Sequence, residues 1–439
     1  SLPASLATAR AYHAQAIGDV PATVKYARRV LDLVPEGATK WRGDATALLG
    51  LAYWTSGDLE AAHQTFADGL AGMKPLDVIV GTFVLAEIKA TLGRLHEAVS
   101  TCEHALQLAT KHGEPMPIGT EDVYTGISEL HRERGDLQAA AQDLATAKKL
   151  GDQIELPDWR YRWCMAQARL KESQADLEGA LDLLDEAERV YVRTPLPKVR
   201  PMAALKARVW VKQNMLAEAL GWMRDRGLSV EDDLSYLREF EHITLARVLI
   251  AQYNSDRVDR SIDDAMGLLE RLLKAAEEGR RTGSVIEILV LQALAHEALG
   301  DLPRALDPLE RALTLAEPQG YVRIFVDEGL PVAQLLSAAS ARGIAPDYTV
   351  KLLAEFEAEE HKREDLAHLP ATQPLIEPLS KRELEVLQLI AQGLSNREIC
   401  ERLFLALPTV KGHNRRIYRK LQVQRRTEAV ARARELGLL

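Results

Sequence analysis

Basic side chains recur at helical spacing near the C-terminal end of the 439-residue chain. At the helical period of about 3.6 residues, positions 410–421 form a helix with one packing side and one cationic side. Ammonium and guanidinium groups on one helix face can pair with phosphates and donate hydrogen bonds to base edges. The pattern therefore predicts a helix that binds nucleic acid through its basic side. The packing side comprises Val410, Asn414, Ile417 and Leu421, and the basic side comprises Gly412, Arg415, Arg416 and Arg419, with Lys411 beside them.

Two capping signals precede this helix and indicate how it is positioned. Ser380 with Glu383, and Ser395 with Glu398, have the Ser-x-x-Glu spacing of a capping box, in which each side chain bonds the backbone N–H of the other residue. Each box marks the start of a short helix, and Gly393 between them predicts the end of the first one. The sequence therefore predicts three successive helices around one small apolar core.

Residues 379–439 resemble the LuxR-type helix-turn-helix family of DNA-binding domains. The resemblance is carried by residues 379–387, 393–399, 409–413, 417–421 and 426–430. It implies a four-helix domain whose third helix enters the major groove of double-stranded DNA, with Lys411, Gly412 and Arg415 at the base edges. The family usually has a capping Ser shortly before Thr409, which this chain lacks, so the start of the third helix stays open. The residues that we expect to contact phosphates are Asn396, Thr409, Arg416, Arg419 and Lys420.

Charge is divided unevenly along the chain. Residues 380–439 contain 13 Lys or Arg and 6 Asp or Glu, a net charge of +7. The whole chain has 55 basic and 64 acidic residues, a net charge of −9, so the preceding residues carry −16. Cationic groups gain affinity for DNA by releasing its condensed counterions, whereas an acidic surface is repelled by it. We therefore expect DNA to bind the C-terminal segment alone.

The composition indicates a mainly helical, well-packed chain with room for two or three domains. Hydrophobic residues make up 47% of it, and there are 27 Gly and 19 Pro. No apolar stretch reaches the roughly 18 residues of a spanning helix, and the three cysteines are widely spaced, so we expect a cytoplasmic protein without membrane contact. The chain has no Gly-x-x-x-x-Gly-Lys-Ser/Thr loop and no His-Glu-x-x-His or Gly-x-Ser-x-Gly motif. We therefore expect no enzyme, cofactor or metal site in it.

A short turn motif recurs along most of the chain. Gly-Asp, or a related pair, stands before an aliphatic residue at positions 18, 57, 93, 135, 175, 214 and 300. Successive turns down to position 214 lie 39, 36, 42, 40 and 39 residues apart, and the gap of 86 before position 300 fits one degenerate repeat near residues 254–258. The period predicts eight helical hairpins, in which a Gly ends the first helix and an Asp caps the second.

Hairpins of this kind cannot bury their apolar sides alone, so they stack into a superhelix. The repeats resemble tetratricopeptide (TPR) repeats, with a period somewhat longer than the usual length of about 34 residues. The predicted fold is all-α, a right-handed superhelix of TPR-like hairpins followed by the small four-helix LuxR-type domain. We assign residues 1–345 to the superhelix, 346–378 to a charged helix and proline-rich linker, and 379–439 to the DNA-binding domain.

Residues 316–329 resemble the junction in large MalT-like regulators, where a superhelical sensor region precedes a LuxR-type domain. The resemblance implies a transcription regulator, which we expect to be an activator. Its superhelix would bind a small-molecule inducer, regulatory proteins or both, and control self-association on DNA. Such regulators carry an N-terminal nucleotide-binding region, whose phosphate-binding loop this chain lacks. We therefore expect the C-terminal part of a longer protein or, alternatively, a relative that lost its ATPase.

Two tryptophans form the candidate ligand-binding patch. Trp159 and Trp163 are four residues apart and share one helix face, and indole rings stack well on sugars and planar ligands. The competing interpretation is that each Trp fills the core of its own repeat. A second class of function is also open, in which the repeats are a docking scaffold that recruits a partner protein to DNA and sense no small molecule.

Overall fold

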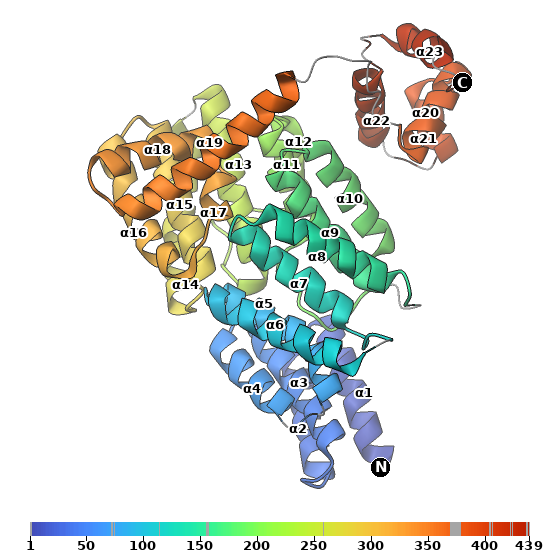
Figure 1. Ribbon diagram of the computed structural model, residues 1–439, viewed down its shortest axis with the longest axis vertical. Coiled ribbons are helices and arrows are strands. Elements are labelled where there is room, and N and C mark those ends of the chain that lie inside the picture. Colours follow the sequence, from blue (N-terminus) through green and yellow to red (C-terminus); the bar gives the residue numbers. More distant parts are fainter. Residues whose placement is uncertain are drawn as a thin grey trace. The chain divides into compact units, whose positions relative to one another are not determined.

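The computed structural model describes every residue except 1, 72, 74, 114, 155–157, 258, 369–378, 404, 406, 422, 424, 436, 437 and 439. The elements of the described residues are all helices, which confirms the predicted all-α class. The chain divides into two units, Ser1–Glu360 and His361–Leu439 (Figure 1). Within the part that the structure describes, no helix combines the length and apolar character needed to cross a membrane.

The first unit is built from antiparallel pairs of helices that are adjacent in the chain. Eight such pairs lie within the described residues, as the turn spacing predicted. The second helix of each pair buries small and aliphatic side chains, such as Ala140 and Leu144. The pairs are α1 (Leu2–Ile17) with α2 (Val20–Leu33), α3 (Thr39–Ser56) with α4 (Leu59–Ala71), α5 (Pro75–Thr91) with α6 (Leu95–His112), α7 (Thr120–Glu133) with α8 (Leu137–Gly151), α9 (Asp158–Ser173) with α10 (Leu177–Val190), α11 (Met202–Lys212) with α12 (Leu216–Asp225), α13 (Glu239–Asp256) with α14 (Asp259–Glu278), and α15 (Thr282–Ala298) with α16 (Leu302–Ala316).

The turn between the helices of a pair contains a residue in the left-handed conformation. Gly135, with φ 88°, is one of the predicted turn glycines that adopt it, and the following Asp136 accepts a hydrogen bond from the N–H of Ala139. Arg257 lies at the turn of the degenerate repeat predicted near residues 254–258, which confirms that repeat. The turns without glycine have Ala175 (φ 60°), Asn214 (φ 58°) and Arg257 (φ 56°) at this position.

The superhelix closes on itself, because residues far apart in the chain meet between its successive turns. The indole N–H of Trp54 donates to the hydroxyl of Tyr236 at 2.8 Å across 182 residues of chain. A Cβ atom on the turn residue Gly93 would lie 2.6 Å from the Cβ of Thr282, so only glycine fits there. We call these contacts the seam, which joins α3, α5 and α7 to η1 (Tyr236–Arg238), α15 and α17 (Arg323–Val326).

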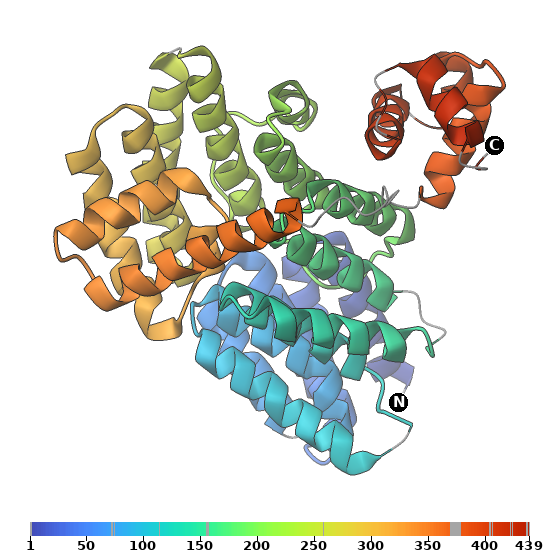
Figure 2. The same cartoon turned by 45° about the horizontal axis from the view of Figure 1, so that its top comes forward.

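Four further helices lie between the last pair and residue 369, namely η2 (Glu317–Gln319), α17, α18 (Leu330–Ala341) and α19 (Pro346–His368). We assigned residues 346–378 to a helix and linker outside the superhelix, but the first part of α19 packs on it (Figure 2). Tyr348 and Leu352, one helical turn apart, are buried, and the Tyr348 hydroxyl donates to the carbonyl of Tyr321. The prolines at 370, 374 and 378 lie outside the described residues.

The second unit contains α20 (Lys381–Ala391), α21 (Asn396–Leu403), α22 (Leu407–Lys420) and α23 (Arg426–Glu435), the four helices that the family resemblance implied. Both capping boxes are present, with the reciprocal bonds of Ser380 and Glu383 at the start of α20 and those of Ser395 and Glu398 at α21. The fully buried core side chains from the four helices include Val386, Leu387, Ile399, Val410, Ile417 and Ala429.

Glu383 joins two of these helices through a buried ion pair. Its side chain is fully buried, and its Oε2 lies 2.9 Å from Nζ of Lys420 on α22 and 2.7 Å from the backbone N of Ser380. Burial acts to raise the pKa of Glu383, but the hydrogen bonds from Ser380 and Lys420 outweigh it and hold the pKa below its ordinary value. Glu383 therefore stabilises the folded unit above the ordinary carboxyl pKa, and this contribution is lost as the pH falls through its lowered pKa.

The seam predicts unequal effects of two identical substitutions. Gly18 and Gly93 have φ of 83° and 81°, but an added Cβ meets nothing within 4 Å at Gly18. Gly18→Ala should cost about 1 kcal/mol for left-handed alanine. Gly93→Ala should cost about 1–3 kcal/mol more, because it presses against Thr282. Urea unfolding of the chain, followed by circular dichroism, measures the free energy of unfolding of both variants. The reverse change, Ala175→Gly, should stabilise the first unit by about 1 kcal/mol. Equal losses at the two glycines would contradict the seam.

The ion pair of Glu383 predicts the effect of Lys420→Met. The substitution leaves a buried carboxylate without its ammonium, so α20 and α22 should lose about 2 kcal/mol of local stability near neutral pH. Because the pKa of Glu383 then rises, less stability should remain to be lost on acidification. Hydrogen exchange of the α20 and α22 amides in the whole chain, followed at several pH values, measures both the local stability and its loss on acidification. The control Arg425→Met removes an exposed pair with Glu428 and should change little. Unchanged exchange in Lys420→Met would rule out the structural role.

Candidate functional site

The third helix of the second unit has the packing side that its sequence predicted. α22 begins at Leu407, so Pro408 lies in its first turn, where a backbone N–H is not needed. Val410 and Ile417 are fully buried, and Asn414 and Leu421 are almost so. The start of the helix, which the sequence left open, is thereby fixed three residues before Val410.

Three cations remain exposed on the other side of α22. Lys411, Arg415 and Arg419 follow one another at intervals of four residues, so they form a single stripe along the helix. Gly412 lies beside this stripe, and a Cβ on it would come within 3.7 Å of Nη2 of Arg416. The exposed stripe therefore contains the two side chains expected at base edges and one of those expected at phosphates.

Two of the residues predicted to contact phosphates, Arg416 and Lys420, lie outside the exposed stripe. Lys420 pairs with Glu383 inside the unit, and Arg416 is only 9% exposed. Both residues lie on the same side as His413, which is also buried, because residues three and four apart share a helix face. The packed side of α22 is therefore wider than its apolar residues indicated. Arg416 and Lys420, which were expected at phosphates, therefore do not belong to the exposed stripe.

The two remaining predicted residues lie at the junction of α21 and α22. The Oδ1 of Asn396 accepts a hydrogen bond from Nδ2 of Asn414 at 2.8 Å, which ties the start of α21 to the packed side of α22. Asn396 and Thr409 are both partly exposed. Asn396 also lines a shallow hollow together with Lys411 and Arg426. The structure therefore brings Asn396 and Lys411 to one place, where helix N–H groups and a cation favour an anion.

The first unit contains a partly open cavity of ≈ 590 Å³. Its wall is formed by the first helix of every hairpin from α3 to α15, by the loop that contains Arg200, and by α17. The seam borders it, because Trp54 and Tyr236, which bond each other across the seam, both line the cavity. This volume lies within the range of about 300–1,000 Å³ typical of sites for small molecules.

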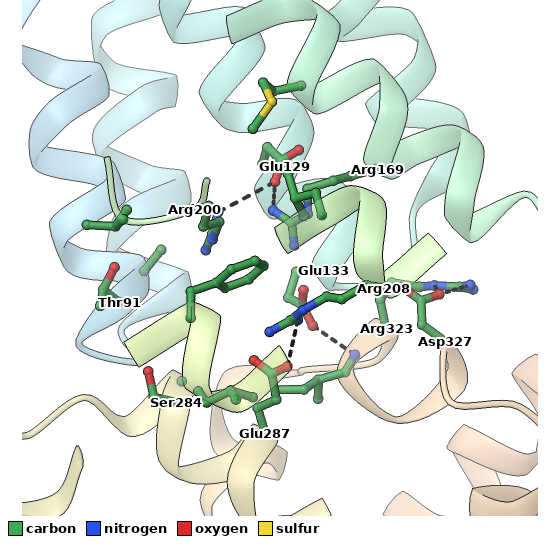
Figure 3. Close-up of a pocket in the computed structure, with 18 of the residues that line it drawn as sticks. Thr91, Glu129, Glu133, Arg169, Arg200, Arg208, Ser284, Glu287, Arg323 and Asp327 are labelled. Carbon is green, nitrogen blue, oxygen red and sulfur yellow. Dashed lines mark hydrogen bonds and ion pairs between the residues drawn. The ribbon is translucent and has the colours of Figure 1, made fainter. Parts of the chain in front are cut away.

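Alternating acidic and basic side chains cover much of the cavity wall (Figure 3). Nη1 of Arg208 lies 2.7 Å from Glu287, and Lys212 lies 2.7 Å from Glu172. Glu129 pairs with both Arg169 and Arg200. These pairs connect helices of different hairpins, so the charged wall holds successive repeats together as well as presenting polar groups to the interior.

Burial changes the pKa of several wall residues. Desolvation, together with the neighbouring Arg200, lowers the pKa of Arg169 to about 9, and desolvation lowers that of Arg208 to about 10. Both guanidinium groups remain cationic at neutral pH. Desolvation acts to raise the pKa of Glu287, but Arg208 and Arg247 outweigh it and lower the pKa to about 2. Burial raises the pKa of Glu87, so the negative charge of this carboxyl is disfavoured.

The predicted ligand patch at Trp159 and Trp163 does not lie on this cavity. Trp159 is only 7% exposed and packs against Gly151, and the Trp163 indole N–H donates to the carbonyl of Leu144 at 2.8 Å. Both indoles thus pack in the interface between α8 and α9, which belong to successive hairpins. On α9, Tyr161 and Arg162 line the cavity instead, because residues between 159 and 163 face another side of the helix.

Sequence reasoning missed the charged wall, although the repeat carries a signal for it. Four successive hairpins have a charged residue six positions before the turn residue, at 87, 129, 169 and 208, ahead of turns at 93, 135, 175 and 214. All four line the cavity. Charged residues at equivalent positions of stacked repeats come to lie along one surface, so this register could have indicated a polar interior.

Comparisons with known proteins agree with the two units. The family described as "MalT-like TPR region" matches residues 4–342, and the family described as "Bacterial regulatory proteins, luxR family" matches residues 377–433. The HTH-type transcriptional regulator MalT of Klebsiella pneumoniae is 24% identical over 476 residues, covering 93% of this chain and 51% of that protein. MalT of Vibrio cholerae is 24% identical over 474 residues, covering 94% and 51%. The chain thus spans about half the length of these relatives.

One solved structure supports the fold of the first unit. A Rap protein, determined in complex with the Competence and Sporulation Factor, superposes with a TM-score of 0.50 at 12% sequence identity, covering 68% of this chain and 81% of that one. At this identity the likeness concerns the fold alone. With the family matches to both units, it follows that this chain belongs to the MalT-like family and carries a luxR-family helix-turn-helix DNA-binding domain after its TPR-like superhelix.

Proposed function

We propose that this protein is a transcription activator that senses a small-molecule inducer in the cavity of its superhelix and thereby controls its self-association on promoter DNA. The observation that carries the proposal is the partly open cavity of ≈ 590 Å³, walled by helices from seven hairpins, in the same chain as a luxR-family domain. A ligand in such a place contacts many repeats at once, so its binding can change how they stack.

The DNA-binding part of the proposal rests on the exposed stripe of α22. Lys411 and Arg415 lie in the second and third turns of the helix, and Arg419 follows one turn later. In a helix that enters the major groove, the N-terminal side chains reach base edges and later ones reach the backbone. We propose that Lys411 and Arg415 read bases with Gly412 allowing close approach, and that Asn396, Thr409 and Arg419 contact phosphates.

A route from the cavity to the end of the first unit is supported by Arg323. This guanidinium lines the cavity and is only 3% exposed. Its Nε donates to Asp327 at 2.7 Å, its Nη2 donates to the carbonyl of Ser173 at 3.1 Å, and its Nη1 pairs with Glu359 of α19. A ligand that alters the position of Arg323 would change how firmly α19 is held, and α19 leads along the chain toward the DNA-binding unit.

The second candidate function is a docking scaffold that recruits a protein to DNA without sensing a small molecule. TPR-like superhelices present extended surfaces suited to protein ligands, which is the observation that favours it. The two functions differ in the cavity, because a scaffold that senses no small molecule needs no charged cavity in its interior.

The exposed stripe predicts two kinds of loss in DNA binding. Lys411→Ala and Arg415→Ala should each cost about 1–3 kcal/mol on the preferred sequence and reduce sequence preference. Arg419→Ala should weaken all sequences alike and lower the slope of log K against log salt by about one. Fluorescence anisotropy with specific and random duplexes at several salt concentrations measures both. The control Arg434→Ala, an exposed cation on α23, should leave sequence preference unchanged. If the Lys411→Ala and Arg415→Ala variants keep their sequence preference, the assignment of these residues to base edges in the major groove is wrong.

The single tryptophan among the described cavity-lining residues predicts an optical signal for inducer binding. A ligand that enters the cavity should change the emission of Trp54, whose N–H bonds Tyr236. Titration of the chain with a metabolite panel should therefore show saturable changes that Trp54→Phe abolishes. The matched Trp222→Phe should keep them, since Trp222 is buried away from the cavity. If no compound changes the emission while a folded protein partner binds tightly, the scaffold function is favoured.

A further inference from the structure

The cavity wall has more cationic than anionic character in one region. Arg169 and Arg200 share a single carboxylate, that of Glu129, whose oxygen lies 3.9 Å from Nη1 of Arg200. Arg208 shares Glu287 with Arg247. Three guanidinium groups, those of Arg169, Arg200 and Arg208, thus pair with only two carboxylates. One of these carboxylates, that of Glu287, also pairs with Arg247. Figure 3 shows these three side chains extending into the same part of the cavity.

Other acidic groups nearby do not supply the missing charge. Glu172 is already paired with Lys212 at 2.7 Å. Glu87 faces Arg169 and Arg200, but burial raises its pKa and disfavours its ionised form. The positive charge around the three arginines is therefore only partly neutralised by the protein.

One N–H donor of the three arginines has no hydrogen-bond partner among the described residues. Nη2 of Arg208 is buried and unbonded, while its Nε donates to Thr244 at 2.8 Å and its Nη1 bonds Glu287. A buried donor without an acceptor costs roughly 1–3 kcal/mol, so a bound molecule that brings an acceptor within reach of this atom would recover part of that cost. The guanidinium lies over the ring of Phe240, with its central carbon 3.7 Å from the ring centroid, a contact that helps to hold it in place.

Apolar surface adjoins the three arginines. Phe83, Tyr161, Tyr236 and Phe240 line the same cavity, and aromatic rings provide large, rigid surfaces for a ligand body. Small-molecule sites typically combine such surfaces with a few placed polar groups. The arrangement suits a molecule with an anionic end and an apolar or unsaturated remainder.

We propose that the inducer is a small organic anion, whose carboxylate or phosphate group is held by Arg169, Arg200 and Arg208 and whose apolar part lies against Phe240 and its aromatic neighbours. Guanidinium groups bind either anion through paired N–H donors, which makes carboxylate and phosphate the shared chemistry. This inference rests on the proposed sensing function, because it names the class of ligand that the cavity takes.

The test uses the whole chain and a protein-free small-molecule extract of cells that carry its gene. Anion exchange divides the extract into a bound, anionic fraction and an unbound fraction of neutral and cationic compounds. Thermal unfolding of the chain is then followed with each fraction. We expect the anionic fraction to raise the midpoint in a dose-dependent way, and treatment of this fraction with a phosphatase separates the two sources, since only a phosphate ester loses its effect.

Variants of the wall decide whether the arginines are responsible. Arg200→Gln and Arg208→Gln should each require about tenfold more of the anionic fraction for the same stabilisation. Lys198→Gln removes a charge from the same wall, where Lys198 lies over Tyr191, and should leave the dose unchanged. Glu129→Gln removes the carboxylate that competes for Arg169 and Arg200, so it should lower the required dose.

The outcomes separate the inference from the proposed function. Stabilisation by the unbound fraction alone would overturn the anionic ligand while leaving small-molecule sensing intact. Stabilisation by the anionic fraction to the same degree in Arg200→Gln, Arg208→Gln and Lys198→Gln would overturn the assignment of the arginines. If neither fraction stabilises the chain, sensing itself fails, and the inference fails with it.

Discussion

The closure of the superhelix is the constraint on which the rest of the first unit depends. In an open stack of hairpins each repeat contacts only its neighbours, but here the Trp54–Tyr236 and Val322–Glu133 hydrogen bonds join residues of different superhelical turns. Where hairpin turns approach the seam closely, as at Gly93, a side chain cannot be accommodated. Another hairpin turn has an alanine, Ala175, in the left-handed conformation. The seam thus requires glycine at position 93 and also borders the cavity.

An interior lined with ion pairs is not what stability alone would produce. Buried ion pairs cost desolvation that their attraction only partly returns, and well-packed apolar residues of similar size are often equally stable or better. Yet Arg208 and Arg247 are both held by Glu287, and Arg132 lies between Glu133 and Asp327. The hairpins already have apolar cores between their own helices, so the charged wall is an addition to them. Its composition fits a surface that recognises polar ligands.

Local chemistry was predictable from the sequence, and long-range placement was not. The turn period located even the repeat at Arg257, and Ser-x-x-Glu spacing located the starts of α20 and α21, since capping and turn formation depend on residues a few positions apart. The spacing of Trp159 and Trp163 is the same whether the indoles are packed or face a ligand. Their placement is decided by contacts with Gly151 and Leu144, which belong to the preceding helix. The pairing of Lys420 with Glu383 joins residues 37 positions apart, and no periodicity within one helix indicates such a contact.

The partial neutralisation of the wall also bears on how a ligand could act as a signal. A ligand shifts a protein between two arrangements only by the difference in its affinity for them. Arginines that share carboxylate partners offer an incoming anion both a partial exchange of partners and the attraction that remains, so the net gain is modest. A coupling of about 1–3 kcal/mol is typical of regulated sites, and an exchange of this kind suits that range. Because Arg323 contacts both the cavity acid Asp327 and Glu359 of α19, such an exchange in the wall has a direct mechanical route to the end of the superhelix.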